Sequence, residues 1–176
     1  MYRLWIWYNT HVMDYLHVTH ESIPPFYDSK SQILILGSLP SIGSRKAGFY
    51  YAYRTNRFFK VLASLYKETE PLSTEERKSF LLRHRIALFD VIKECDIKGS
   101  SDSSIKNPVI NDFSFVQETK ISQVFTTGSL AHKLYNLYVF DDDIPLPSPS
   151  AANAQMSLDQ LISAYSIILS FLKEKS

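Results

Sequence analysis

Residues 31–37 read SQILILG, with four consecutive aliphatic residues that end in a glycine. A half-exposed strand would alternate polar and apolar residues, whereas an unbroken aliphatic run is typical of a strand buried on both faces of a parallel sheet. Pro24 and Pro25 interrupt the chain before this run, and a long loop over residues 38–55 is expected after it. The run therefore predicts a buried strand of a parallel sheet.

Outward from this strand, the sequence alternates between strand and helix patterns. Further strands are expected at residues 86–92, 121–126 and 144–146, and helices at residues 56–66, 73–84, 111–119, 128–138 and 157–172. This order is typical of an α/β domain with a parallel sheet. Such sheets bind ligands at the carboxyl ends of their strands, so we expect the site in the loops at residues 37–56 and 146–154.

The composition limits the class of protein and the kinds of site. The 176 residues suffice for one domain, and 45% of them are hydrophobic, which argues against disorder. The formal net charge is +1, so a polyanionic partner would have to meet a local concentration of positive charge. Cys95 is the only cysteine, which excludes a disulfide within the chain and a four-cysteine cluster. His17 and His20 have no second ligand pair nearby in the sequence, so no metal or other cofactor is expected.

We expect an N-terminal extension over residues 1–30 and one domain over residues 31–176. The first residues are aromatic but lack a signal-peptide cleavage pattern, and no apolar run is long enough to span a bilayer. A cytoplasmic, monomeric protein without a membrane partner is therefore expected. Met13 is an alternative start, in which case residues 1–12 would be an accessory segment, and both possibilities stay open.

Basic and aromatic residues are concentrated in the loop after the first strand and at the start of the next helix. Residues 45–60 contain five basic residues, six aromatic residues and no acid. Basic side chains neutralise phosphates, and an aromatic ring stacked on a base contributes about 1–3 kcal/mol, so this composition indicates nucleic-acid binding. The alternative is a solvated loop over core aromatics. We expect core positions for Phe58 and Phe59, and a ligand surface for the run Phe49-Tyr50-Tyr51.

Five segments in order resemble the uracil-DNA glycosylase superfamily over residues 33–172: LILGSLPS, GFYYAYRTNRFFKVL, LFDVIKECD, VFTTGSLA and LPSPSAANAQMSLDQLISAY. The GSLP opening, the paired tyrosines and the LPS and ANA elements are more similar to its hypoxanthine-DNA glycosylase branch. The resemblance implies a three-layer α/β/α sandwich around a central, mainly parallel four-stranded sheet. It also implies a monofunctional DNA-deoxyinosine glycosylase that acts on DNA in base-excision repair, without a cofactor.

The resemblance implies a catalytic role for Asn56. Mismatch-specific relatives carry a catalytic asparagine in the first motif, where this chain has Leu39, which cannot hydrogen-bond a departing base. In the hypoxanthine branch the asparagine of the Asn-x-Phe-Trp/Phe motif replaces it, and that position is Asn56. An asparagine amide donates and accepts hydrogen bonds without titrating. The alternative role for Asn56, a helix N-cap, is compatible with catalysis.

The resemblance also implies where the base and the DNA strand bind. Tyr51 falls where relatives stack an aromatic ring on the flipped base, and residues 148–151 resemble the loop that pinches the strand. The base is expected to bind Ser38, Leu39, Pro40, Ser41, Phe49 and Tyr51. The DNA is expected to contact Arg45, Lys46, Arg54, Ser148, Pro149, Ser150 and Asn153.

Several assignments stay open at this point. The relatives' polar residue in the strand-pinching loop aligns with Ser148 or with Leu146, and Asn153 is either a wedge in the base stack or a helix-entry residue. Asp90 is expected to be a solvated or capping aspartate. Two other functions keep the same fold: excision of uracil from mismatches, and nucleic-acid binding without catalysis.

Overall fold

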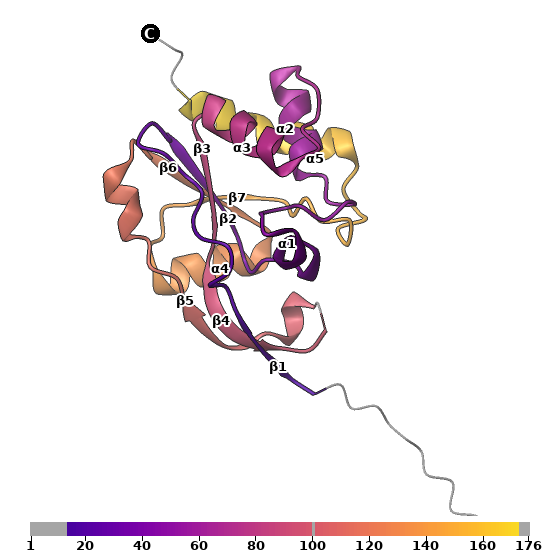
Figure 1. Cartoon of the computed structure of the whole chain (residues 1–176), viewed down its shortest axis with the longest axis vertical. Helices are drawn as coiled ribbons and strands as arrows, with labels where there is room; N and C mark the ends of the chain where they lie inside the picture. Colours follow the sequence, from indigo (N-terminus) through magenta and orange to yellow (C-terminus); the bar gives the residue numbers. More distant parts are fainter. Residues whose placement is uncertain (1–13, 100, 173–176) are drawn as a thin grey trace, which may run out of the picture.

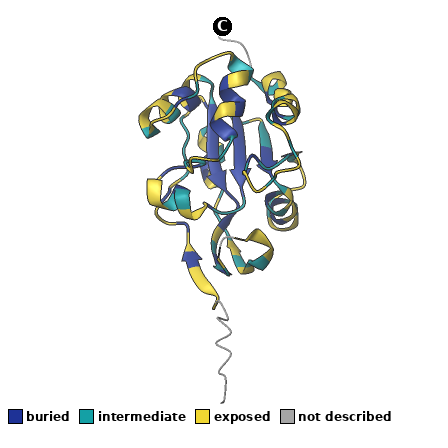
Figure 2. Cartoon of the chain, turned by 90° about the vertical axis from the view of Figure 1, so that its right-hand side faces the viewer, coloured by how far each residue is buried: buried dark blue, intermediate teal, exposed yellow. Residues whose placement is uncertain are grey.

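A four-stranded parallel sheet forms the centre of the computed structural model, which describes residues 14–99 and 101–172 (Figure 1). Its strand order is β3 (Ile86–Asp90), β2 (Ile33–Gly37), β6 (Gln123–Thr127) and β7 (Ile144–Leu146), and all three pairings are parallel. Every residue of β2 is buried, which confirms the prediction from the aliphatic run. Figure 2 shows the buried strands enclosed by partly exposed helices.

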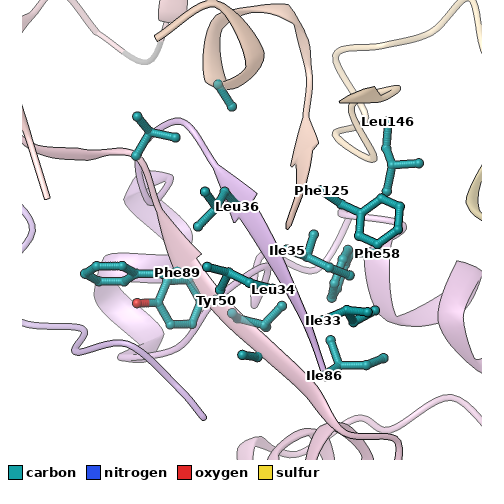
Figure 3. Close-up of a cluster of buried hydrophobic side chains, with 14 of the residues drawn as sticks. Ile33, Leu34, Ile35, Leu36, Tyr50, Phe58, Ile86, Phe89, Phe125 and Leu146 are labelled. Carbon is teal, nitrogen blue, oxygen red and sulfur yellow. The ribbon is translucent and has the colours of Figure 1, made fainter. Parts of the chain in front are cut away.

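Helices cover both faces of this sheet, which confirms the three-layer α/β/α arrangement. The helices α2 (Phe58–Tyr66), α3 (Thr74–Arg83) and α5 (Leu158–Tyr165) lie together on one side, and α4 (Ser129–Tyr138) lies on the other (Figure 1). Side chains of β2 alternate between the two layers. Ile33 and Ile35 point toward Phe58, whereas Leu34 and Leu36 point toward the side of Phe89 (Figure 3).

The helix boundaries follow their capping residues. Ser73 and Ser157 each accept a hydrogen bond from the backbone three residues on, and Glu76 and Gln160 return one, so that α3 and α5 both begin with a capping box. Two predicted helices differ in form. The final one is α-helical only to Tyr165 and continues as the 3₁₀ helix η3 (Ser166–Phe171). The one expected at residues 111–119 is the 3₁₀ helix η2 (Ser114–Glu118).

A second, antiparallel sheet joins β1 (Leu16–Thr19), β4 (Ile92–Ile97) and β5 (Lys106–Ile110) in the order β1-β4-β5. The sequence patterns did not predict this sheet. The pairing of β4 with β5 contains two register shifts. Such irregular pairing disturbs the alternation by which strands are identified from sequence.

The described part of the expected N-terminal extension packs on the domain. Val18 and Ile23 are buried in the core, and Phe26 forms a backbone bridge with Leu88 of β3. Residues 14–30 thus contribute to the same core as the rest of the chain. Residues 1–12 and Met13, the expected accessory segment and alternative start, lie outside the described residues.

Candidate active site

A cavity of about 490 Å³ opens where the central strands end. Gly37, Asp90 and Thr127 are the last residues of β2, β3 and β6, and all three line it. The two loops in which the site was expected meet here. Of the predicted site residues, those that line the cavity are Ser38, Leu39, Pro40, Ser41, Arg45, Tyr51, Asn56, Ser148, Pro149, Ser150 and Asn153.

Tyr51 is held in one orientation at the cavity wall. Its ring stacks on Phe58 with centroids 3.9 Å apart and an angle of 14° between the planes. Its hydroxyl lies 3.0 Å from Oγ1 of Thr127, which itself donates to the carbonyl of Leu36 at 3.3 Å. Burial, and then the nearby charge of Asp90, raise the pKa of Tyr51 well above its usual range. The phenol therefore stays neutral. Because the Thr127 hydroxyl hydrogen points to Leu36, the Tyr51 hydroxyl is the donor of the hydrogen bond to Thr127.

The amide group of Asn56 is held by a backbone contact beside the cavity. Its Oδ1 accepts a hydrogen bond from the backbone N–H of Phe58 at 2.9 Å, just before α2, but the N-cap residue of α2 is Arg57 and not Asn56 as the sequence suggested. Its Nδ2 has no hydrogen-bond partner among residues 14–99 and 101–172, and the side chain lines the cavity. The bond to Phe58 fixes the plane of the amide and leaves the Nδ2 group as a donor for a ligand.

Arg57, which the sequence groups with the basic residues of the loop, is used inside the protein. Its backbone N–H donates to the carbonyl of Pro149 at 3.1 Å. Its guanidinium group donates to backbone carbonyls of the loop that follows β7, those of Pro149, Ser150, Asn153 and Met156. The residue next to Asn56 thus holds the proposed strand-pinching turn. A single basic residue carries no sequence signal for such an inward role.

Hydrogen bonds within the turn stiffen it further. Asn153 donates from Nδ2 to the carbonyl of Ser148 at 3.0 Å, and Oγ of Ser148 accepts from the backbone N–H of Ser150 at 3.3 Å. Tyr165 of α5 donates its hydroxyl hydrogen to the carbonyl of Pro147 at 2.8 Å. The serine hydroxyls and backbone of this turn are therefore presented at the cavity in a fixed arrangement.

Asp90 is buried rather than solvated, which corrects the expectation from the sequence. It is 4% exposed, and its Oδ2 accepts a hydrogen bond from Nε2 of His20, which is 3% exposed, at 2.9 Å. A Cβ atom placed on Gly37 would lie 2.2 Å from Asp90 Oδ1, so the carboxyl group packs where only glycine leaves space. The usable signal was one acid at the end of an otherwise apolar strand.

The prediction that Phe49 binds the base is wrong. The side chain is 2% exposed and packs edge-on against Phe26 and Tyr50, with centroids 5.3 and 5.8 Å away. Gly48 adopts a left-handed conformation, with φ of 68°, and ends the short helix α1 (Ile42–Ala47), after which the chain turns Phe49 into the core. The loop composition could not reveal this turn.

The other predicted residues of the loop after β2 differ in their relation to the cavity. Lys46 and Arg54 are exposed and do not line the cavity, whereas Arg45 does. Ser41 is the N-cap of α1, where its Oγ accepts from the backbone N–H of Ser44 at 3.1 Å. Ser38 donates from Oγ to Oδ2 of Asp102 at 2.9 Å, and Asp102, which was not predicted, lines the cavity.

The grouping of metal-ligand side chains and the length of the helices bear on two other kinds of site. In residues 14–99 and 101–172, no three histidine, cysteine or acidic side chains are grouped so that they could hold a metal ion. Over the same part of the chain, none of the helices has the length and apolar character needed to cross a membrane.

Two proteins named hypoxanthine DNA glycosylase are similar in sequence. The one from Methanosarcina barkeri is 35% identical over 99 residues, which make up 56% of this chain and 63% of the relative, so the match spans less than two thirds of that protein. The one from Methanosarcina acetivorans is 35% identical over 139 residues, which cover 76% of this chain and 88% of the relative.

A solved structure has the same fold. The solution NMR structure of a Methanosarcina acetivorans protein, provisionally named a uracil DNA glycosylase, superposes with a TM-score of 0.68 at 30% sequence identity. The match covers 84% of this chain and 96% of that one. The family model described as the uracil DNA glycosylase superfamily matches residues 24–167, which include every strand of the central sheet. The chain belongs to the uracil DNA glycosylase superfamily.

Proposed function

We propose that this protein is a hypoxanthine DNA glycosylase, which hydrolyses the bond between hypoxanthine and deoxyribose in DNA and releases the free base. The observation that carries the proposal is the meeting of Tyr51, Asn56 and the turn at residues 148–150 around one cavity at the strand ends. The two relatives named hypoxanthine DNA glycosylase support the choice of base. We further propose that the protein is a monomer and that it acts on DNA in the cytoplasm.

The target base has to leave the duplex to reach this cavity. Enzymes that react with a base extrude its nucleotide from the stack, at a cost that is smallest for a poorly paired base such as hypoxanthine. The cavity volume of about 490 Å³ lies within the range of small-molecule sites. One face of the Tyr51 ring is covered by Phe58, so the ring is fixed as a wall against which a flipped base can stack.

The reaction needs donors for the leaving base and a placed water molecule. As the bond between C1′ of the sugar and N9 of the base breaks, positive charge develops on the sugar and negative charge on the base. The water oxygen bonds to C1′, its proton is released, and the base departs and takes up a proton. The Nδ2 group of Asn56 donates to the base, and the second lone pair of Oδ1 accepts from the water. Such a donor contributes a factor of about 10²–10³ in rate.

Phosphate contacts are assigned to the rim of the cavity. The hydroxyls and backbone amides of Ser148 and Ser150 suit phosphate oxygens, and Arg57 keeps their turn in place. Positive charge is assigned to Arg45, which lines the cavity, and to the exposed residues Lys46 and Arg54 of the same loop. Because the net charge of the chain is +1, this local concentration has to attract the DNA.

The test is a panel of duplexes that each contain one hypoxanthine, one uracil in a mismatch, or no lesion. We expect base release from the hypoxanthine duplex, and a loss of about 10²–10³-fold in its rate for Asn56→Ala. Asn136→Ala, which changes an asparagine on α4 away from the cavity, is the matched control and should keep the rate. Preferential release of uracil would assign the other base, and DNA binding without any release would leave only a binding role.

A further inference from the structure

We propose that His20 is a positioning residue of the base cavity: it holds the carboxyl group of Asp90 so that Oδ1 accepts a hydrogen bond from a ring N–H of the flipped base. This inference rests on the proposed function. His20 lies before residue 24, where the family match begins, in a segment that the sequence assigned to an extension. The base selectivity of the site then depends on a residue outside the matched region.

His20 is fixed by contacts on all sides. Its backbone N–H donates to the carbonyl of Lys93 at 2.7 Å, directly after the pairing of β1 with β4, and its carbonyl accepts from Ile23 at 3.2 Å. Its ring packs edge-on against Phe89, with centroids 5.2 Å apart, and lies 6.0 Å from the ring of Tyr50. The imidazole therefore presents Nε2 to Asp90 in one orientation.

The two oxygens of Asp90 have different surroundings. Oδ2 is engaged by His20, whereas Oδ1 lies against Gly37 and has no hydrogen-bond partner among the described residues. Asp90 lines the cavity although it is 4% exposed. Among the described residues, Tyr66 Oη is the one fully buried side-chain polar atom without a partner, so the unpartnered Oδ1 of Asp90 keeps contact with the cavity and is open to a donor that arrives with the ligand.

The donor that fits is the lactam edge of a deaminated base. Hypoxanthine carries N1–H beside its carbonyl, and uracil carries the equivalent N3–H. Adenine, from which hypoxanthine forms by deamination, has an unprotonated N1 that would meet the acceptor Oδ1 with repulsion. Guanine carries the same N1–H as hypoxanthine, but its additional amino group would find no second oxygen of Asp90, because His20 engages Oδ2. A site that is built to receive an N–H strongly rejects the analogue that lacks it.

The role of His20 is to keep this single acceptor in place. Without the Nε2–H group, Oδ2 would be a second unpaired oxygen in a buried position, and the carboxyl group would rotate to reach another donor or water. The misplacement of a contact by about 1 Å costs up to about a hundredfold in rate. The expected loss on removal of His20 is therefore about tenfold to a hundredfold.

The experiment measures single-turnover excision of hypoxanthine and of 1-methylhypoxanthine, which has no hydrogen on N1. Wild-type protein should strongly prefer hypoxanthine. His20→Phe fills a similar space without a donor. It should lower the rate of hypoxanthine excision about tenfold to a hundredfold and reduce the ratio of the rates for hypoxanthine and 1-methylhypoxanthine. His20→Gln, whose amide can donate to Oδ2, should keep part of the excision rate and of the preference for hypoxanthine. In an Asp90→Ala background His20→Phe should have no further effect, because both changes remove one interaction.

The matched control is His84→Phe. It removes a histidine–carboxylate hydrogen bond of 2.9 Å, to Glu68, outside the cavity, and should leave rate and preference as in the wild type. Circular dichroism verifies that each variant is folded. If the wild-type protein excises hypoxanthine and His20→Phe keeps the same preference for hypoxanthine over 1-methylhypoxanthine, or loses rate equally on both, His20 is a packing residue. That result would overturn this inference and leave the proposed function standing. Absence of release by the wild-type protein would overturn the proposed function as well.

Discussion

Arg57 donates from its guanidinium group to the backbone carbonyl of Ser150 at 2.9 Å, across 93 positions of sequence. The bond belongs to a set that joins the start of α2 to the loop after β7. Because Asn56 precedes Arg57 directly, one short segment supplies both the amide at the cavity and the anchor of the opposite loop. The two halves of the site therefore cannot move independently.

Arg57→Lys is expected to destabilise the protein and to slow excision. A lysine ammonium cannot reproduce the planar fork of donors, so several loop carbonyls lose their partner. We expect a loss of about 1.5–3 kcal/mol in the free energy of unfolding, measured with urea, and at least a tenfold loss in excision rate. Arg54→Lys, at an exposed position nearby, is the control. Equal stability of both variants would contradict the anchoring role.

Gly37→Ala is expected to displace Asp90. The added methyl group would lie 2.2 Å from Oδ1, and a buried carboxyl held by His20 has little room to move. We expect about 1–3 kcal/mol of destabilisation and a marked loss of hypoxanthine excision. Gly43→Ala would also clash, at 2.3 Å from Cδ2 of Tyr53, but Tyr53 is 56% exposed, so its whole side chain can shift toward solvent. In thermal unfolding, Gly37→Ala should lose more stability than Gly43→Ala. A Gly37→Ala protein as stable and active as the wild type would contradict the close packing of Asp90 against Gly37.

Tyr51 should act through its ring and not through ionisation. Because its pKa is raised above the ordinary value of 10.0, the phenol stays protonated as the pH rises from about 8 to 10. The pH profile of Tyr51→Phe should therefore match that of the wild type over this range. Tyr51→Ala removes the stacking surface and should weaken binding of hypoxanthine DNA by about 1–3 kcal/mol. If the excision rate of the wild type falls at alkaline pH and that of Tyr51→Phe does not, this assignment is wrong.

Lys46→Ala and Arg54→Ala should weaken DNA binding to a similar degree with and without a lesion. Both side chains are exposed, lie within two residues of cavity-lining residues in the sequence, and are assigned to phosphates, which carry no sequence information. Each change should reduce the slope of log K against log salt by about 1. Fluorescence anisotropy at several salt concentrations measures this slope. Lys133→Ala, on the exposed side of α4, should leave it unchanged.

The parts of the fold with strong local signals were predicted from the sequence. The aliphatic run of β2 and the capping serines of α3 and α5 set their elements through interactions within a few residues. The antiparallel sheet was missed because β1 pairs with a strand more than 70 positions away, and because the pairing of β4 with β5 is irregular. No local pattern reports such contacts.

The same distinction separates the site residues. The segments around Tyr51 and Asn56 carried a recognisable motif, and the structure brings them to one cavity. The buried pair of His20 and Asp90 was missed because the two residues are 70 positions apart and a lone aspartate is usually solvated. Phe49 was misassigned because the left-handed turn at Gly48 decides which way its side chain faces.

The position of β1 has a practical consequence for anyone who shortens this protein. A chain trimmed to residues 24–167 would keep everything by which the family is recognised, yet it would expose the backbone edge of β4 and lose the imidazole behind Asp90. An exposed strand edge favours aggregation. If the proposed roles hold, we expect such a fragment to combine poor solubility with weak discrimination between damaged and normal bases, although the loops around the cavity are unchanged.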